Sequence, residues 1–500
     1  MFIANKIRTV ATTEETITFD RFQTNANSDE SDNVVDERQT KSSYNFKGTS
    51  GNLEPGYGFS VLKLPETETT ATTREIEIYE QSPILDLWHF RYYDESTNKP
   101  QERLFWFNAD GYLAYCKVFS YDPSSYEIND LEPILNPPTG LNLTINDVDY
   151  MIFSHDNGVV KITQNTKTIK NDLPLKKFVS MANAYGGVYA INEGKRNKIT
   201  YSNDQPDPTE WTLLENTLDL TDERGRCNKL MFFDDYLFAF RDYGITKISK
   251  YSASDDFSTS NLFQTSAKIY PNTVAKCGDF VVFMAKDGIY NFNGQTTKKF
   301  DFDINKLLNV NDNANATACY QNGKYFLACK LNFDDNKQIG AEAYANGFVN
   351  NALITIDLNT NQLTITRGVD IRSMLSLNSG NLSTVVACFN GEHSHKLGML
   401  DNSGKLFDTA LESSWKSVKI DLDRPEINKV LKEIYIKTSQ ATTLKITTDS
   451  TESEIQINAK QTLQKIKTNI SGKEFQFELI SSNNPKIEIF KAKFRSKKSN

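Results

Sequence analysis

Residues 228–300 have the sequence NKLMFFDDYLFAFRDYGITKISKYSASDDFSTSNLFQTSAKIYPNTVAKCGDFVVFMAKDGIYNFNGQTTKKF, in which one pattern occurs twice at a spacing of 44 residues. In each copy a polar turn precedes an apolar run, and a turn with Asp and Gly leads into a second apolar run. A repeat of about 40 to 50 residues built from short strands and tight turns is typical of a β-propeller. The aligned residues are Asp235, Tyr236, Leu237, Gly244 and Ile245 in the first copy and Asp279, Phe280, Val281, Gly288 and Ile289 in the second.

The second copy predicts one blade of four short antiparallel strands. Apolar runs of strand length occupy residues 269–276 and 280–286, and Asp287-Gly288 supplies a two-residue turn in which both residues can adopt a positive φ. Asn293-Gly294 supplies a second such turn, after which a fourth strand extends to Phe300. The spacing of apolar residues does not fit a helix anywhere in this copy, so we expect an all-β fold.

Further copies of the pattern lie on both sides and predict a ring of six or seven blades, a choice that the sequence leaves open. Alternating aromatic residues, such as Phe105 with Phe107 and Phe238 with Phe240, are expected to pack between neighbouring blades. The strand runs of the further copies are 104–107 and 112–119; 150–153 and 159–163; 188–191 and 199–202; 324–331, 353–358 and 363–366; and 385–389, 396–400 and 405–407.

These repeats occupy the middle of the chain and divide it into three parts. We expect an extended N-terminal arm at residues 1–80, a six- or seven-bladed β-propeller at residues 81–412 and a small β-sandwich at residues 413–500. The arm is rich in Thr, Asn, Asp, Glu and Ser and cannot bury enough apolar surface to fold alone. It is either a disordered tail or an arm that a neighbouring subunit orders.

The C-terminal part lacks the repeat spacing and contains about six short alternating runs, followed by another at residues 486–494. Short alternating runs in a segment of this length are typical of a small β-sandwich. The chain then ends in a basic stretch at residues 491–498. This stretch is either a solvated tail or a contact for an acidic neighbour or a DNA backbone.

Composition and charge restrict the class of protein. The chain carries 56 basic and 64 acidic side chains, and a net charge of −8 is too balanced for a protein that wraps nucleic acid. Neither a membrane-spanning run nor a secretory leader is evident, so we expect no membrane insertion and no export. The six cysteines form no C-x-x-C pair and are expected to be reduced core residues, with Cys319 opposite Phe326 across a turn.

No familiar motif for catalysis, for a cofactor or for a metal occurs in the sequence. Ser202-Asn203-Asp204 with Trp211 is similar to the Asp-box of sialidases, but Pro206 and Pro208 stand where the turn glycine belongs. Asp-boxes stabilise the turns of blades and are not catalytic, so we expect a structural role for this stretch. His393 and His395 lack the further ligands that a zinc site requires. We therefore expect no catalytic, cofactor-binding or metal-binding residue, no cofactor and no enzymatic activity.

The charged residues in the repeated turns were the remaining candidates for chemistry. Arg241 and Asp242 lie in the Asp- and Gly-bearing turn of the first copy, and Asp287 lies in that of the second copy. Because they occur at turn positions of a repeated scaffold, we expect them to stabilise the turns.

Several stretches together resemble a known protein family. In these stretches the chain resembles the stabilisation proteins of tailed bacteriophages. Those proteins are related to the packaged-DNA-stabilising tail hub and nozzle proteins of short-tailed phages. The stretches are Asp36-Glu37-Arg38, Asn45-Phe46, Gly56-Tyr57-Gly58-Phe59, Tyr201-Ser202-Asn203-Asp204 with Trp211, Lys229-Leu230, Phe240-Arg241-Asp242-Tyr243-Gly244-Ile245, Ile269-Tyr270-Pro271-Asn272-Thr273-Val274 and Ala285-Lys286-Asp287-Gly288-Ile289-Tyr290-Asn291-Phe292-Asn293-Gly294.

The resemblance implies a non-enzymatic structural protein of the virion. Such proteins form a homo-oligomeric ring, commonly a hexamer, below the portal and adaptor, where they contact other tail proteins. The ring extends the DNA channel, retains packaged double-stranded DNA and lets it out at ejection without sequence-specific binding. The resemblance therefore implies assembly in the host bacterial cytoplasm and a final location in the tail or neck of the virion.

Two other functions fit a propeller. The first is a glycan-binding or glycan-degrading receptor-recognition propeller of a phage tail, and the second is a cytoplasmic kelch or WD scaffold with a peptide partner. Glycan recognition requires exposed Trp platforms or paired carboxylates, whereas Trp88 and Trp106 fall within strand patterns. Kelch and WD signatures are missing from the turns. The sequence therefore favours the structural virion ring.

Overall fold

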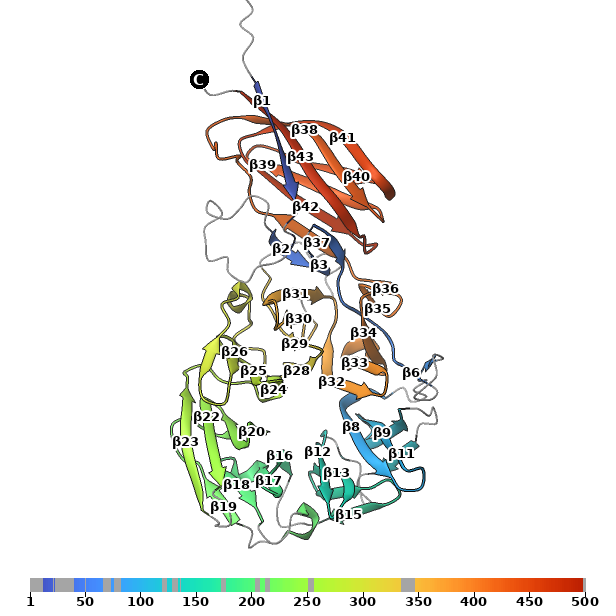
Figure 1. Ribbon diagram of the computed structural model, residues 1–500, viewed down its shortest axis with the longest axis vertical. Helices are drawn as coiled ribbons and strands as arrows, with labels where there is room; N and C mark the ends of the chain where they lie inside the picture. Colours follow the sequence, from blue (N-terminus) through green and yellow to red (C-terminus); the bar gives the residue numbers. More distant parts are fainter. Residues whose placement is uncertain are drawn as a thin grey trace, which may run out of the picture.

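The computed structural model shows an all-β protein with a ring of sheets at one end and two further sheets at the other (Figure 1). Within the residues that the structure describes, the helical segments are 3-10 turns of three or four residues: η1 (Glu193–Lys195), η2 (Pro208–Glu210), η3 (Pro271–Thr273), η4 (Asp303–Lys306) and η5 (Gly391–His393). The predicted all-β class is confirmed.

The described residues are 12–20, 22, 40–49, 51–65, 73–75, 82–118, 124–127, 134, 136–171, 177–202, 207–211, 216–250, 256–333 and 347–497.

Seven sheets follow one another around the ring, and in the first six of them four strands lie side by side in chain order (Figure 1). The first strand of each sheet lies near the centre of the ring, and the later strands lie toward its rim. This is the arrangement of a β-propeller. The first three sheets contain β8 (Ile84–Asp94), β9 (Lys99–Asn108), β10 (Tyr112–Lys117) and β11 (Ser124–Glu127); β12 (Thr139–Ile145), β13 (Val148–His155), β14 (Gly158–Ile162) and β15 (Lys167–Asn171); and β16 (Phe178–Ala184), β17 (Gly187–Asn192), β18 (Lys198–Tyr201) and β19 (Asn216–Asp219).

The next three sheets repeat this order because tight turns reverse the chain between strands. Asn322 and Gly323, for example, both have positive φ values of 48° and 77° in the turn that places Cys319 opposite Phe326, as predicted. The three sheets contain β20 (Cys227–Phe233), β21 (Tyr236–Arg241), β22 (Gly244–Lys250) and β23 (Phe257–Gln264); β24 (Ala275–Cys277), β25 (Phe280–Ala285), β26 (Gly288–Phe292) and β27 (Thr297–Lys299); and β28 (Thr317–Gln321), β29 (Lys324–Cys329), β30 (Ala352–Asp357) and β31 (Gln362–Arg367).

The seventh sheet takes its fourth strand from the N-terminal part of the chain. Strand β5 lies between β34, with which it pairs antiparallel, and β35. Gly58 is needed at the start of β5, because a Cβ atom there would lie 2.3 Å from the carbonyl oxygen of Lys405. Backbone hydrogen bonds thus join the segment that precedes the first sheet to the seventh sheet. The strands of this sheet are β32 (Ile371–Ser379), β33 (Leu382–Phe389), β34 (Leu397–Asp401), β5 (Gly58–Val61), β35 (Lys405–Leu406) and β36 (Thr409–Ala410).

Aromatic side chains fill the gaps between neighbouring sheets of the ring. The rings of Phe105 and Phe153, which belong to the first and second sheets, have centroids 5.6 Å apart. Between the fourth and fifth sheets, Phe238 and Phe240 pack on Phe292 at centroid distances of 5.1 and 6.3 Å. The predicted packing of these residues between sheets is confirmed.

A hydrophobic cluster also joins the seventh sheet to the first. It contains Ile84 and Leu104 from β8 and β9 together with Leu377 and Val386 from β32 and β33, and all four side chains are fully buried. Strand β32 also contacts β8 at the centre. Burial of apolar surface therefore continues all the way around the ring.

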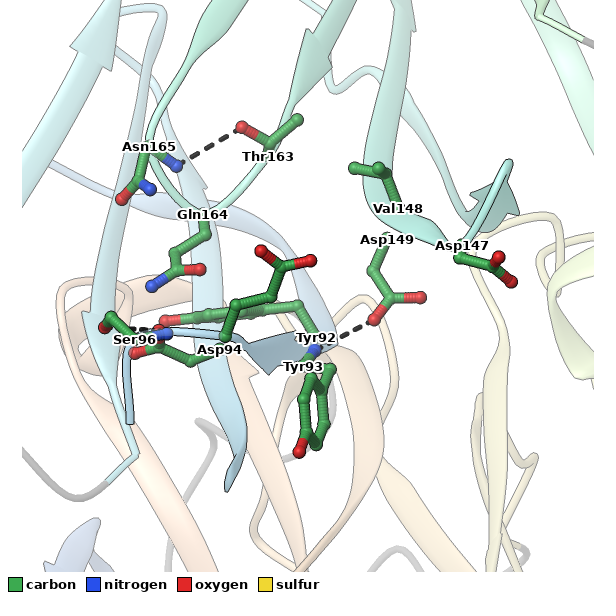
Figure 2. A pocket seen from close by; sticks show the side chains of 11 residues that line it. Tyr92, Tyr93, Asp94, Ser96, Asp147, Val148, Asp149, Thr163, Gln164 and Asn165 are labelled. Atoms are coloured by element: carbon green, nitrogen blue, oxygen red, sulfur yellow. Dashed lines mark hydrogen bonds between the residues drawn. The ribbon is translucent and has the colours of Figure 1, made fainter. Parts of the chain in front are cut away.

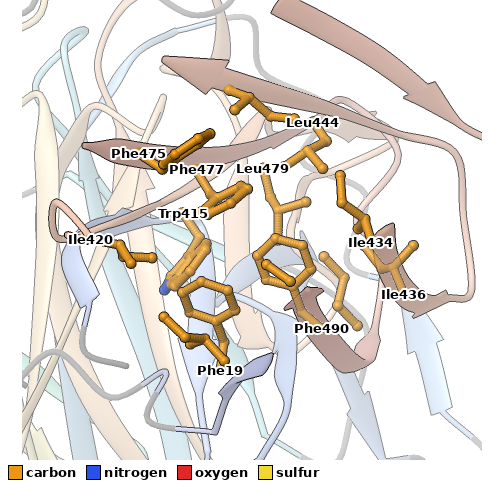
Figure 3. Close-up of a cluster of buried hydrophobic side chains, with 14 of the residues drawn as sticks. Phe19, Trp415, Ile420, Ile434, Ile436, Leu444, Phe475, Phe477, Leu479 and Phe490 are labelled. Carbon is orange, nitrogen blue, oxygen red and sulfur yellow. The ribbon is translucent and has the colours of Figure 1, made fainter. Parts of the chain in front are cut away.

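The two C-terminal sheets share one core (Figures 1 and 3). In the first sheet β43 lies between β38 on one side and β1 and β4 on the other, and in the second sheet β42 lies between β37 and β39. The strands are β1 (Thr12–Phe19), β3 (Phe46–Gly48), β4 (Leu53–Pro55), β38 (Lys429–Thr438), β41 (Lys460–Gly472) and β43 (Ile487–Lys497) in the first sheet, and β2 (Thr40–Tyr44), β37 (Ser413–Ser417), β39 (Thr442–Thr448), β40 (Glu452–Ile457) and β42 (Phe475–Ser481) in the second.

Phe19 of β1 is buried in this shared core, beside Trp415 and Phe490 (Figure 3). Its ring stacks on Phe490 at a centroid distance of 4.6 Å and meets Trp415 edge-on at 5.5 Å. The indole Nε1–H of Trp415 donates a hydrogen bond to Thr40 Oγ1 at 2.8 Å, which satisfies its only polar group. Aromatic contacts therefore bind the N-terminal strands to the C-terminal sheets.

The described part of residues 1–80 differs from both alternatives considered for the arm. It forms strands that pair within the chain: β1 with β43, β2 with β37, β4 with β43 and β5 with β34. The short hairpin of β6 (Lys63–Pro65) and β7 (Thr73–Glu75) follows. The expectation overlooked Phe19, Phe22, Phe46 and Leu53, which are few but almost completely buried. A polar segment needs little apolar surface of its own when it adds strands to an existing sheet.

Two predicted turns in the second copy are wrong. The two-residue turn is Lys286-Asp287, because Ala285 pairs with Gly288. Residues 293–296 form a longer loop, since Phe292 pairs with Thr297 and the side chain of Asn293 accepts hydrogen bonds from the loop backbone. Asn side chains commonly close such loops in place of a tight turn.

The strand predicted at 269–276 is also shorter than expected. Only Ala275–Cys277 forms a strand, because Pro271 starts the 3-10 turn η3. Proline has no N–H for a strand ladder and suits the first position of a helical turn. Conversely, β32, the innermost strand of the seventh sheet, was not predicted from the sequence.

The basic stretch at 491–498 forms a strand, not a tail, as far as residue 497. It is the second half of β43 and pairs with β1. Lys493 and Arg495 form ion pairs with Glu14 of β1 at 2.7 and 3.4 Å. The acidic neighbour of this stretch is therefore part of the same chain.

The six cysteines lie where the sequence places them. All six are free and buried. Burial raises the pKa of the Cys116 thiol to about 12 and that of the Cys227 thiol to about 11. Neutral, buried thiols are poor nucleophiles and behave as small apolar residues.

The position of Phe19 predicts its contribution to stability. Phe19→Ala should lower the free energy of unfolding of the C-terminal sheets by about 3 to 5 kcal/mol, because it removes a buried ring at a junction of two segments. Urea unfolding followed by tryptophan fluorescence measures this change, since Trp415 contacts Phe19. As a control, Phe232→Ala removes a side chain that is 36% exposed and should cost less than about 1 kcal/mol. Equal losses in the two variants would contradict this account of the core.

Candidate functional site

A cavity of about 670 Å³ lies at the centre of the ring. Its wall is formed by β8, β20, β28 and β32, by the turn η3 and by connecting segments. Because the first strand of each sheet faces the ring axis, residues that are distant in sequence, such as Asp86 and Lys229, line the same space. The volume is within the range of about 300 to 1,000 Å³ that ligand sites usually have.

The wall of this central cavity carries two cations and one carboxylate. Asp86 accepts hydrogen bonds from Ser373 Oγ at 2.6 Å and from the backbone N–H of Leu87 at 2.9 Å. Burial nevertheless raises the pKa of the Asp86 carboxyl group. The ammonium group of Lys229 makes no hydrogen bond or ion pair to the described residues, and burial lowers its pKa although the charge of Asp86 opposes this. Arg372 donates from Nε to a backbone carbonyl of β8 at 3.1 Å.

Asparagine side chains line another part of the central cavity. Asn350 is only 1% exposed, and its Nδ2 donates to the carbonyl oxygens of Asn315 and Ile371 at 3.0 and 2.8 Å. Asp370 fixes the same segment, since it accepts hydrogen bonds from the backbone N–H of Asn350 and from Asn390 Nδ2, both at 2.9 Å. The Oδ1 atom of Asn350 is a buried acceptor without a donor among the described residues.

A second pocket, of about 520 Å³, lies between the first two sheets of the ring (Figure 2). The hydroxyl and backbone N–H of Ser96 donate to Asp94 Oδ1 at 2.6 and 2.9 Å, and these bonds hold the pKa of Asp94 well below its usual range. Asp149 accepts a hydrogen bond from the backbone N–H of Tyr93 at 2.9 Å. The side chain of Tyr93 is 51% exposed. This pocket is open and acidic, with one exposed aromatic ring.

The charged turn residues singled out in the sequence hold backbone segments in place. Arg241 is 1% exposed and donates from Nη2 to the carbonyl oxygens of Leu220 and Gly225, both at 2.7 Å. Its Nη1 atom lies 2.7 Å from Asp222 Oδ1. This guanidinium group therefore fastens the segment that precedes β20.

The two aspartates of these turns also have local partners. Burial opposes a charge on Asp242, but hydrogen bonds from Asn228 and Arg226 outweigh it and lower the pKa of the carboxyl group. Asp287 accepts hydrogen bonds from Tyr290 Oη at 2.7 Å and from Lys299 Nζ at 3.1 Å. None of these residues is among those that line the central cavity.

The histidines and the Asp-box-like stretch do not come together. His393 lies on η5, where it pairs with Glu392 at 3.2 Å and packs on Phe407. Residues 203–206 lie outside the described residues, and Trp211 is buried against Phe178. Within the part of the chain that the structure describes, no group of three or more His, Cys, Asp or Glu side chains could hold a metal ion. No helix in that part is long and apolar enough to cross a membrane.

His155 is fully buried at the end of β13. Its Nδ1 accepts a hydrogen bond from the backbone N–H of Asn157 at 3.2 Å, while Nε2 has no partner among the described residues. Burial lowers the pKa of His155 to about 4, with Asp156 opposing and Lys177 adding to the shift. The folded protein therefore keeps this imidazole neutral at pH values at which the unfolded chain binds a proton.

This burial predicts a loss of stability in acid. Because the folded pKa is lower than the unfolded value of about 6.5, stability is complete above pH 6.5 and falls as the pH decreases toward 4. His155 should contribute about 2 kcal/mol to the difference in unfolding free energy between pH 7.5 and pH 5. Urea unfolding at both pH values checks this, and His155→Asn should reduce the difference by that amount. An unchanged difference in the variant would show that another group is responsible.

Comparisons with known proteins find similar solved structures and no related family. No family model matches the chain, and no curated protein matches it. Among solved structures it is similar to BamB from Moraxella catarrhalis, with 10% identity over 78% of this chain and 97% of that chain and a TM-score of 0.37. It is also similar to BBS1N in complex with ARL6DN, with 10% identity over 64% of this chain and 97% of that chain and a TM-score of 0.39. A third similar structure is that of the computationally designed Ika8 protein. It has 12% identity over 64% of this chain and 96% of that chain and a TM-score of 0.35.

Proposed function

We propose that this protein is a structural subunit of a tailed-bacteriophage virion. In this proposal it forms a homo-oligomeric ring, a hexamer, as a tail hub or nozzle below the portal and adaptor. The ring extends the DNA channel, retains packaged DNA and lets it out at ejection, and the protein has no enzymatic activity. The proposal rests on the resemblance of the repeated turns and the N-terminal stretches to phage stabilisation proteins, and the following features support it.

We further propose a complete architecture for the subunit. The seven sheets are the blades of a closed seven-bladed β-propeller, in which β5 supplies the fourth strand of the last blade. Strands β37–β43, together with β1–β4, form a β-sandwich. The hydrophobic cluster that contains Ile84 and Leu377 supports closure, since it joins the first and last blades.

The single observation that best supports a mechanical role is the course of the N-terminal segment. Within about fifty residues it adds β1 to the C-terminal sheets, returns as β2, β3 and β4, and then closes the ring as β5. At the junction the side chain of Asn45 donates to the carbonyl of Glu412 at 2.6 Å and accepts from the backbone N–H of Arg367 at 2.7 Å. One continuous segment therefore ties both modules together, as a subunit under load requires.

The proposal predicts specific assembly with the neighbouring rings. The purified protein should form a hexamer, alone or on addition of the portal and adaptor rings of the same phage, and imaging of the complex should place it below the adaptor. Size-exclusion chromatography with light scattering measures the mass, and a portal ring from an unrelated phage is the control. A protein that remains monomeric and does not bind the matched portal and adaptor rings would contradict the proposal.

A second candidate function is glycan binding by a receptor-recognition propeller. The pocket of Figure 2 favours it, because the exposed Tyr93 lies beside the carboxylates of Asp94 and Asp149. Aromatic faces with nearby polar groups are suited to sugar rings. In the assembly experiment, this function would appear as a monomer that binds oligosaccharides and loses that binding in the Tyr93→Ala variant.

A further inference from the structure

We infer that the central cavity of the ring binds a small organic oxyanion, a phosphate ester or a carboxylate, through Lys229 and Arg372. This site is independent of the proposed assembly into a virion ring. It combines a cavity of about 670 Å³, an excess of positive charge and polar groups whose hydrogen-bonding capacity is unused.

The charges of the cavity favour an anion. Lys229 and Arg372 carry two positive charges on its wall, and Asp86 carries the one negative charge. Asp86 is already engaged, because Ser373 Oγ and a backbone N–H donate to its carboxyl group. The cavity therefore has one cation more than its own carboxylate can neutralise, and a bound oxyanion would balance it.

Lys229 is the most direct indication of a ligand. The side chain of Lys229 is half-buried, and partial withdrawal of an unpaired ammonium group from water is costly. The ammonium group of Lys229 has no hydrogen bond or ion pair to the described residues, and burial lowers its pKa. An oxyanion that accepts hydrogen bonds from Nζ would remove this cost.

Arg372 and Asn350 indicate what else the ligand contacts. Arg372 uses Nε for a backbone carbonyl, and its terminal N–H groups remain able to bind a second oxygen of a phosphate or carboxylate group. Asn350 lines the same cavity with an Oδ1 atom that has no donor among the described residues. The wall thus offers donors for an anionic group. Asn350 Oδ1 is itself buried, so its side chain must turn before a ligand hydroxyl group can satisfy this acceptor.

The size of the cavity limits the ligand to a small molecule. A volume of about 670 Å³ corresponds to roughly twenty water molecules at about 30 Å³ each, which accommodates a molecule of monosaccharide size. The shared chemistry is one oxyanion with hydroxyl groups. Glycerol 3-phosphate and gluconate represent the phosphate ester and the carboxylate, and glycerol represents the hydroxyl groups alone.

Calorimetric titration and thermal unfolding of the full chain test the inference. Glycerol 3-phosphate, gluconate or both should bind at millimolar concentration or better and raise the melting temperature, whereas glycerol and sodium chloride at equal ionic strength should not. Lys229→Met and Arg372→Met should each weaken the binding at least tenfold. Lys229→Arg, which keeps the charge, should retain most of it.

Lys298→Met is the matched control, because Lys298 is an exposed lysine on the outer strand β27. It should bind the same anion as tightly as the wild type does. The inference is overturned if neither anion binds the wild type, or if Lys298→Met weakens binding as much as Lys229→Met does. Unchanged binding in folded Lys229→Met and Arg372→Met variants would also overturn it.

Discussion

Backbone pairing between β5 and β34 is the interaction on which the ring depends. Without β5 the seventh sheet would present an open edge in β34, and unpaired strand edges favour association with other chains. The N–H of Leu62 and the carbonyl of Phe59 extend this pairing to Leu397 and Phe407 at 3.0 and 2.6 Å. Because Gly58 has no room for a side chain, the approach of this strand is also tightly constrained.

The same N-terminal segment determines how the ring and the C-terminal sheets are joined. It carries Phe19 into the core beside Trp415 before it reaches the ring. The segment therefore contributes to both modules of the molecule. The central cavity is a separate feature, since Asp86, Lys229 and Arg372 on its wall come from three different sheets.

The ring could be predicted from the sequence because its information is local. The pattern around Asp235 and Asp279 fixes strand, turn and strand within a few residues, and a repeat displays it many times. The N-terminal strands could not be predicted, because β1 and β5 pair with partners more than 300 residues away and contain few apolar residues. The cavity residues were missed for a related reason: Asp86 and Lys229 belong to different sheets and meet only after the ring has closed.

Hydrogen exchange of the intact protein tests most directly whether the N-terminal segment holds the molecule together. The amides of β1 and β5 should exchange as slowly as those of β43 and β34, since each pair of strands opens together. Peptides from the two pairs, followed by mass spectrometry from seconds to hours, give both rates in one experiment. Exchange of β1 and β5 within seconds, while β43 and β34 stay protected, would contradict the account.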